Sequence, residues 1–176
     1  VNGKRIIAVV KANAYGHGAI ECSKRLEDQG CDFFSVFTVE EAKELRNAGL
    51  KSDILILSKL EKESIQTAID NDLIVNISSI DDLDSITFHL EKNGLSPRFH
   101  MKIETGMNRL GFDLSDISLA IGKLLDYKNL NCEGIYTHYA TSDEGDLSYA
   151  HLQLERFEQA LEIANEMGYT FKYKHI

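Results

Sequence analysis

The chain alternates short apolar runs with segments of helical periodicity along its whole length. The runs are rich in β-branched residues, which is typical of strands buried on both faces of a parallel sheet. Between them, apolar residues recur every three or four positions, as on the buried face of a helix. The seven runs lie at residues 6–10, 32–39, 53–58, 73–78, 99–104, 134–139 and 171–176. This order predicts an α/β fold of parallel strands joined by helices, in a single unit without a linker.

Two parallel architectures fit this alternation. A doubly wound sheet would more often carry a G-x-G-x-x-G fingerprint, and the sequence has none. A (β/α)8 barrel fits better, although it needs one strand more than the seven runs provide. We therefore predict a truncated (β/α)8 TIM-type barrel with about seven strands, formed by residues 1–176 as one partial domain.

Several helix ends are marked by side chains that can satisfy backbone groups. Thr38 with Glu41 has the pattern of a capping box, and Ser79 with Asp82 repeats the same logic. Gly94 is placed to end the helix that begins after Ser79. The longest predicted helix carries an apolar stripe at Ala150, Leu154, Phe157, Leu161 and Ala164.

The composition excludes several classes of function. A net charge of -9 argues against nucleic acid or an anionic membrane surface as a partner, because both require clustered Lys and Arg. No apolar run approaches the roughly 20 residues that span a bilayer, and the first residues lack a signal-peptide pattern, so we expect a cytoplasmic protein. The three cysteines and six histidines show no metal-ligand spacing, so no metal site is predicted.

Polar residues stand where the predicted strands end. In a (β/α)8 barrel these ends share one rim, where such enzymes hold their chemistry. Each of these side chains alone is more simply a solvated lysine or a core histidine, but their convergence favours a site. The two glycines after the first strand, Gly16 and Gly18, predict backbone amides that approach an anion. The polar strand ends are Lys11, Lys102 to Thr105, His138 and His175.

Three segments carry a family resemblance: VVKANAYGHG at 9–18, ETGMNRLGF at 104–112 and YTHYATSDE at 136–144. With TVEEAKELRNAG at 38–49 and QLERFEQAL at 153–161, they span essentially the whole chain. Together they closely resemble the alanine racemase family, the fold-type III enzymes that use pyridoxal phosphate.

The resemblance implies a role for each matching residue. Lys11 would form the internal aldimine with pyridoxal phosphate and then serve as one of two proton-transfer bases. Tyr15 would contact the cofactor phosphate, and His138 would pack against the pyridine ring. Arg109 would lie near the cofactor's phenolic oxygen and the substrate carboxylate. Lys102 matches a lysine that is carbamylated in many members, and the resulting anion could hold the guanidinium of Arg109.

The implied activity is interconversion of L-alanine and D-alanine, which supplies D-alanine for peptidoglycan. In the family the second base is a tyrosine of the partner subunit's C-terminal β domain, so a homodimer is expected for the full-length enzyme. That domain and the eighth strand are absent from this sequence. We therefore expect the fragment to be unable to racemise alone.

Two alternatives remain open at this point. Most relatives have a glycine and proline loop where this chain has Ser58-Lys59-Leu60-Glu61-Lys62. That departure leaves a serine racemase-type domain as an alternative. The other alternative is a non-catalytic module that binds pyridoxal phosphate or a protein partner, since the unpaired edges of an open barrel invite association.

Overall fold

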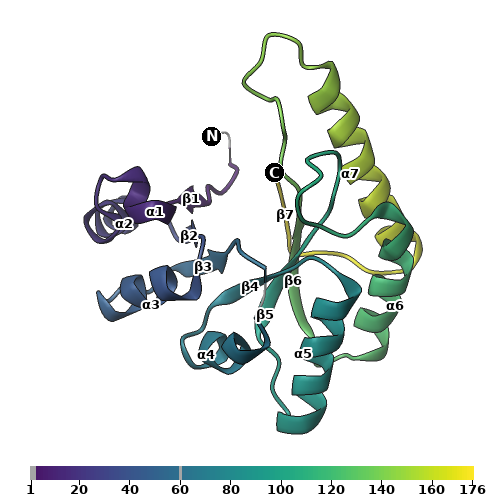
Figure 1. Cartoon of the computed structure of the whole chain (residues 1–176), viewed down its shortest axis with the longest axis horizontal. Coiled ribbons are helices and arrows are strands. Elements are labelled where there is room, and N and C mark those ends of the chain that lie inside the picture. The colour runs from purple at the N-terminus through teal and green to yellow at the C-terminus, as the bar shows by residue number, and fades with distance from the viewer. Residues whose placement is uncertain (1–2, 60) are drawn as a thin grey trace. The chain divides into compact units, whose positions relative to one another are not determined.

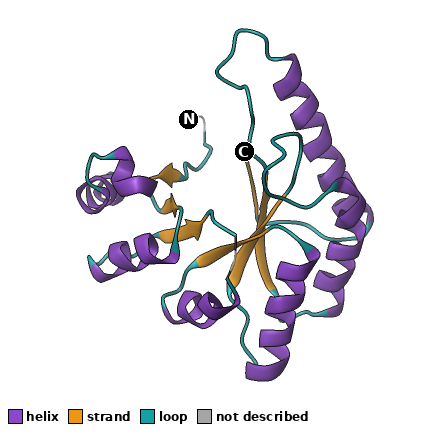
Figure 2. Ribbon diagram, in the orientation of Figure 1, coloured by secondary structure: helices purple, strands orange, loops and turns teal. Residues whose placement is uncertain are grey.

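The computed structural model describes residues 3–59 and 61–176, so Leu60 of the divergent loop lies outside the described residues. The chain divides into two compact units, Val1–Asn76 and Ile77–Ile176. In both units strands lead into helices along the chain, as the ribbons of Figures 1 and 2 show. The described residues contain seven strands, as predicted.

The first unit contains four parallel strands in the order β1-β2-β3-β4. They are β1 Ala8–Val9, β2 Phe33–Val36, β3 Asp53–Ile56 and β4 Ile74–Ile77, whose last residue falls in the second unit. The helices are α1 Lys11–Tyr15, α2 Ala19–Asp28, α3 Val39–Asn47 and α4 Ile65–Asp70, with a 3-10 turn η1 at Lys62–Ser64. The register places Phe34 beside Ala8 on one side and Ile54 on the other.

The core of the first unit is formed where β2 and β3 meet the inner side of α3. Thr38 starts α3 as predicted: its side chain accepts from the Glu41 N–H, and the Glu41 carboxylate accepts from the Thr38 N–H. This reciprocal cap fixes the helix start and turns Ala42 and Leu45 inward. The buried apolar side chains here include Phe33, Phe34, Val36, Ile54, Leu55 and Ile56.

The second unit contains three parallel strands, β5 Arg98–Lys102, β6 Asn131–Tyr136 and β7 Tyr173–His175, paired in that order. Its helices are α5 Ile80–Asn93, α6 Ile117–Asp126 and α7 Ser148–Glu166, with a 3-10 turn η2 at Leu114–Asp116. Ser79 caps α5 by accepting from the Asp82 N–H, and Gly94 ends it in the left-handed conformation, both as predicted. None of the described helices is long and apolar enough to cross a membrane.

Two details differ from the sequence prediction. The first apolar run is not buried on both faces: Ile6 is 54% exposed and Val9 44%, because β1 pairs with β2 alone among the described strands. The sixth strand lies three residues earlier than the predicted 134–139 and ends at Tyr136. Beyond it, the hydroxyl of Thr137 hydrogen-bonds with the Thr105 hydroxyl and donates to the Ile103 carbonyl, while the Thr137 N–H still donates to the carbonyl of His175 at 3.3 Å.

Candidate functional site

Lys11 lies directly after β1, at the start of a strained backbone turn. The preceding residue, Val10, is buried and its N–H donates to the carbonyl of Ser35 on β2 at 2.9 Å, which fixes where the strand stops. The next four residues, 12–15, all have φ between 51° and 54°, the left-handed region. Such a conformation costs about 1–2 kcal/mol for each residue other than glycine. A turn of this kind persists only where its surroundings over-determine it, and such turns cluster at functional sites.

Hydrogen bonds from two side chains hold the Lys11 turn in place. The N–H of Ala12 donates to Oε1 of Glu41 at 2.7 Å, although Glu41 is 29 residues further along the chain. The side chain of Asn13 accepts from the N–H of Ala19 at 2.8 Å and so ties the turn to the first residue of α2. The backbone adds the bond from the Ala14 N–H to the Val10 carbonyl at 2.9 Å. Lys11 itself is half-buried.

The two glycines after this turn do not serve the predicted role. The N–H of Gly16 donates to the carbonyls of Ala12 and Asn13, and the N–H of Gly18 donates to the carbonyl of Asn13. Both amides are therefore used within the loop, and the prediction that they approach an anion is wrong. The glycines are needed instead for their backbone, because φ is 89° at Gly16 and 93° at Gly18.

Tyr15 is the last residue of the left-handed turn, and its side chain is 62% exposed. Because its backbone is fixed by the turn, the phenol is presented from a rigid support rather than from a mobile loop. The first unit thus combines one half-buried amine, at Lys11, with one exposed phenol, at Tyr15.

In the second unit, the loop 103–112 after β5 closes on itself and carries Arg109. The N–H of Phe112 donates to the carbonyl of Lys102 at 2.8 Å, and the N–H of Glu104 donates to the carbonyl of Phe112 at 2.9 Å. The Glu104 carboxylate accepts from the N–H groups of Gly106 at 2.6 Å and Arg109 at 3.1 Å. Burial acts to raise the pKa of Glu104, but the backbone N–H donors of this loop outweigh it, so the pKa lies below its ordinary value. The charged carboxylate therefore organises the backbone from which the exposed Arg109 side chain projects.

Lys102 is the last residue of β5 and is only 5% exposed, so it is not a solvated strand lysine. Its Nζ lies 5.7 Å from the centre of the Tyr136 ring. Burial raises the pKa of Tyr136, and the positive charge of Arg109 partly opposes that shift. Lys102 and Arg109 thus share Tyr136 as a neighbour, and that residue remains a neutral phenol at physiological pH.

His138 follows β6 and has an exposed side chain, so it is not a core histidine. Its carbonyl accepts from Nε2 of Gln153 at 3.1 Å, and the same amide donates to the hydroxyl of Thr105 at 3.2 Å. Oε1 of Gln153 accepts from the N–H of Ala140 at 2.9 Å. Gln153 is 0% exposed, and it joins the loop after β5 to the loop after β6.

Two more side chains of α7 bind the loop after β5. The guanidinium of Arg156 donates to the carbonyl of Thr105 at 2.8 Å, and the hydroxyl of Tyr149 donates to the carbonyl of Gly106 at 2.7 Å. The sequence prediction missed both of these residues and Gln153. A polar residue at position 153, three positions after Ala150 and four before Phe157, breaks into an apolar stripe and was the signal available in the sequence.

His175 is half-buried and packs among aromatic side chains, which agrees with the simpler of its two interpretations, a histidine with a structural role. Its Nε2 lies 2.9 Å from Nδ1 of His100, and its ring stacks on Tyr136 with centres 4.7 Å apart. Burial lowers the pKa of His100 to about 3, with the charges of His175, Arg98 and Lys172 acting in the same direction. Burial likewise lowers the pKa of His175 to about 4. Both rings are neutral at physiological pH.

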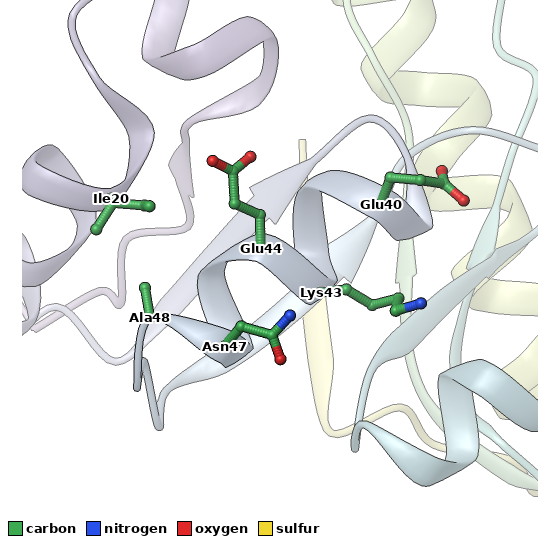
Figure 3. Close-up of a pocket in the computed structure, with 6 residues that line it drawn as sticks. All are labelled: Ile20, Glu40, Lys43, Glu44, Asn47 and Ala48. Atoms are coloured by element: carbon green, nitrogen blue, oxygen red, sulfur yellow. The ribbon is translucent and has the colours of Figure 1, made fainter.

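Two cavities among the described residues lie in the first unit. One, of about 490 Å³, lies on the outside of the unit between α2 and α3; Figure 3 shows Ile20 facing a row of α3 side chains across it. The other, of about 280 Å³, is lined by residues at and beyond the C-terminal ends of β2, β3 and β4. Neither is lined by any of the five predicted site residues, so the candidate site rests on those side chains and their supporting bonds. Among residues 3–59 and 61–176, no group of three or more His, Cys, Asp or Glu side chains is placed to hold a metal ion.

The predicted residues therefore fall into two groups. Lys11 and Tyr15 lie together in the first unit, and Lys102, Arg109 and His138 lie in the second. Within each group the side chains stand at strand ends or on the loops that follow, as the sequence predicts.

The sequence model of a protein family described as "Alanine racemase, N-terminal domain" matches residues 1–176. The chain belongs to this family. The alanine racemase of Methanococcus maripaludis is 38% identical over 172 residues, which are 97% of this chain and 46% of that protein. Alanine racemase 1 of Bacillus subtilis is 38% identical over 157 residues, 89% of this chain and 40% of that protein. The chain thus spans less than half the length of these relatives.

Solved structures of the alanine racemase family agree with the fold described above. The crystal structure of alanine racemase from E. faecalis has a TM-score of 0.90 at 36% identity, covering 99% of this chain and 47% of that one. A histidine racemase from Leuconostoc mesenteroides has a TM-score of 0.89 at 25% identity, covering 99% of this chain and 46% of that one. These likenesses confirm the predicted fold class, the parallel α/β fold of the family's TIM-type barrel domain.

Proposed function

We propose that residues 1–176 are part of the N-terminal barrel domain of a pyridoxal-phosphate-dependent alanine racemase that acts in the cytoplasm. The observation that carries this proposal is the Lys11 turn. A half-buried lysine follows the first strand, on a left-handed turn whose Ala12 and Ala14 N–H groups donate to Glu41 and to the Val10 carbonyl, with an exposed tyrosine at its end. Family membership supplies the reaction class, and relatives named alanine racemase supply the substrate.

The described residues fit pyridoxal phosphate chemically. Its aldehyde requires a primary amine, which Lys11 provides, and its phosphate requires donors, of which the Tyr15 hydroxyl is one. Arg109 offers a guanidinium for anionic oxygens of cofactor or substrate, and His138 offers an exposed ring that can pack on the pyridine. When bound, the cofactor withdraws electrons from the α-carbon of the amino acid, which makes its proton removable.

Lys11 then acts as a base at one face of the α-carbon. Its Nζ takes the α-proton and can return it, so a second base is needed at the opposite face to invert the centre. We assign that second base to a tyrosine of a partner subunit's C-terminal β domain, and hence a homodimer to the full-length enzyme. The expectation that this chain alone does not racemise rests on the same assignment.

Lys102 is proposed to be carbamylated. The amine of Lys102 is buried beside Tyr136, and the positive charge of Arg109 acts on the same phenol. Reaction of its amine with carbon dioxide replaces the positive charge by a negative one, which can bind the guanidinium. Intact mass should then exceed the sequence mass by about 44 Da, with the increment lost in acid.

Alanine is the preferred substrate on present similarity. Among the solved structures, an alanine racemase is 36% identical to this chain, whereas the histidine racemase is 25% identical. Serine is the nearest alternative, because the 58–62 loop departs from the family pattern.

The test is to add pyridoxal phosphate to the chain, reduce with borohydride and map the modified peptides by mass spectrometry. A phosphopyridoxyl label confined to Lys11 supports the proposal. A label spread over surface lysines, or none at all, contradicts a working cofactor site in this chain. Formation of D-alanine by the purified chain would overturn the expectation that it is inactive alone.

A further inference from the structure

Glu41 forms more hydrogen bonds than a helix cap requires. Its Oε2 accepts from the N–H groups of Phe37 at 2.7 Å and Thr38 at 3.1 Å, which is the acidic half of the capping box. Its Oε1 accepts from the N–H of Ala12 at 2.7 Å. The carboxylate therefore joins the start of α3 to the residue that follows Lys11.

The bond to Ala12 acts at the point where the backbone becomes strained. Ala12 is the first residue of the left-handed turn, with φ of 51° and ψ of 49°. A charge-assisted hydrogen bond is roughly twice as strong as a neutral one, so this contact is suited to holding a conformation that the chain does not prefer. The peptide bond fixed in this way is the one that joins Lys11 to Ala12.

The chemistry of the contact requires a carboxylate. Three backbone donors converge on two oxygens, and a carboxylate offers acceptors only. In glutamine one of these oxygens becomes an NH2 group, which would face a backbone N–H. A Glu41→Gln variant must therefore lose either the Ala12 contact or the two contacts at the start of α3.

We propose that Glu41 is a positioning residue for Lys11: it holds the left-handed turn and so fixes the direction in which the lysine amine is presented. The inference deepens the proposed function and rests on it for the cofactor chemistry. Glu41 touches neither cofactor nor substrate in this assignment and acts through the Ala12 amide alone.

The test compares Glu41→Gln with two matched variants of the same chain. Thr38→Ala removes the side-chain half of the capping box and leaves the Ala12 contact untouched. Glu44→Gln removes one negative charge from an exposed position of the same helix, α3, which Figure 3 shows. Labelling of Lys11 by limiting pyridoxal phosphate and borohydride is measured at a temperature where all the variants are folded by circular dichroism.

Glu41→Gln should lower Lys11 labelling about tenfold, the scale seen when an outer-shell partner of a functional group is lost. Thr38→Ala and Glu44→Gln should label as the wild type does. Equal losses in Glu41→Gln and Thr38→Ala would mean that Glu41 merely stabilises α3, and would overturn the proposal. So would wild-type labelling in Glu41→Gln.

A second readout does not depend on the cofactor. Hydrogen exchange at the Ala12 amide, followed by NMR, should be slow in the wild type, Thr38→Ala and Glu44→Gln, and fast in Glu41→Gln. If the wild type takes no label, the proposed function fails for this chain, and the exchange rates still decide whether Glu41 holds the turn. If the Ala12 amide exchanged equally slowly in all four proteins, the inference that Glu41 holds the left-handed turn would be refuted.

Discussion

The two units support their functional loops in different ways. In the first, the Lys11 turn depends on a carboxylate from another element, since Glu41 reaches Ala12 across 29 positions of the chain. In the second, the loop bearing Arg109 is organised from within, because Glu104 binds the amides of residues only a few positions away. Helix α7 then adds Gln153, Tyr149 and Arg156 as outside supports. The first loop is thus sensitive to one remote contact, whereas the second is built redundantly.

The largest effect is expected where the self-closed loop of the second unit has no room to adjust. A Cβ at Gly111 would lie 2.5 Å from the backbone nitrogen of Glu104 and 2.7 Å from the carbonyl carbon of Ile103, with φ at 148°. Gly111→Ala should therefore lower the free energy of unfolding by more than about 4 kcal/mol, the range reserved for severe backbone conflict. Urea unfolding followed by circular dichroism measures it.

Gly145→Ala is the matched control, because nothing lies within 4 Å of its added Cβ. It should change the unfolding free energy by less than about 0.5 kcal/mol. Similar values for the two variants would show that the loop is pliable and that the comparison between the units is wrong.

Acid should destabilise the second unit through its histidine pair. The folded-state pKa values of His100 and His175, about 3 and about 4, lie below the ordinary value of about 6.5. Below pH 6.5 the unfolded chain therefore binds more protons than the folded chain does. The stability present above pH 6.5 is lost as the pH falls toward 4. Between pH 7 and 5 the free energy of unfolding should fall by about 3 kcal/mol. This value includes a reduced contribution from His175, because solvent screens a half-buried group.

The pH dependence is measured by urea unfolding at several pH values, with His175→Gln as the comparison. That variant keeps hydrogen-bonding groups but cannot titrate at position 175. The slope of its unfolding free energy against pH should therefore be about half that of the wild type. Glu104, whose pKa is lowered, stays charged over this range and does not obscure the result. If the unfolding free energy of the wild type did not change from pH 7 to 5, the interpretation of His100 and His175 as neutral in the folded state would be contradicted.

Removing the support from α7 should have an intermediate effect. Gln153→Leu deprives the Ala140 N–H of its acceptor and removes the donor to Thr105, at a cost of about 2 kcal/mol. Gln159→Leu, on an exposed position of the same helix, should change stability by less than about 0.5 kcal/mol. Urea unfolding of the two proteins sharpens the comparison: equal free energies of unfolding would mean that Gln153 does not support the loop after β5.

The smallest effect is expected at the caps, where the two units are alike. Thr38→Ala in the first unit and Ser79→Ala in the second should each cost about 1 kcal/mol in thermal or urea unfolding. A loss above about 3 kcal/mol at Thr38 would indicate that the start of α3 carries more of the first unit than a cap does.

Local chemistry explains why much of the fold was predictable. The capping residues Thr38 and Ser79 and the stop at Gly94 act on backbone groups within a few positions, so their sequence patterns suffice. The end of the first strand close to Lys11 was likewise predicted, because an apolar run stops where a charge begins, whereas the fifth run was predicted to extend to residue 104 and β5 ends at Lys102. The buried face of α7 was predicted only in part: Gln153 and Ala160 are buried, while Leu154 is half-buried. Polar groups of the neighbouring loops contact that helix, and apolar periodicity alone does not predict which polar residues they bury.

The sequence by itself determined the alternation of strands and helices, the family and the five candidate side chains, since each follows from periodicity or from short contiguous motifs. Only the tertiary structure decided how those side chains are held. The left-handed turn after Lys11, the second role of Glu41 and the burial of Lys102 and Gln153 all depend on groups far apart in the chain. A hydrogen bond or a desolvated charge is defined by which atoms meet in space, and sequence order does not specify that.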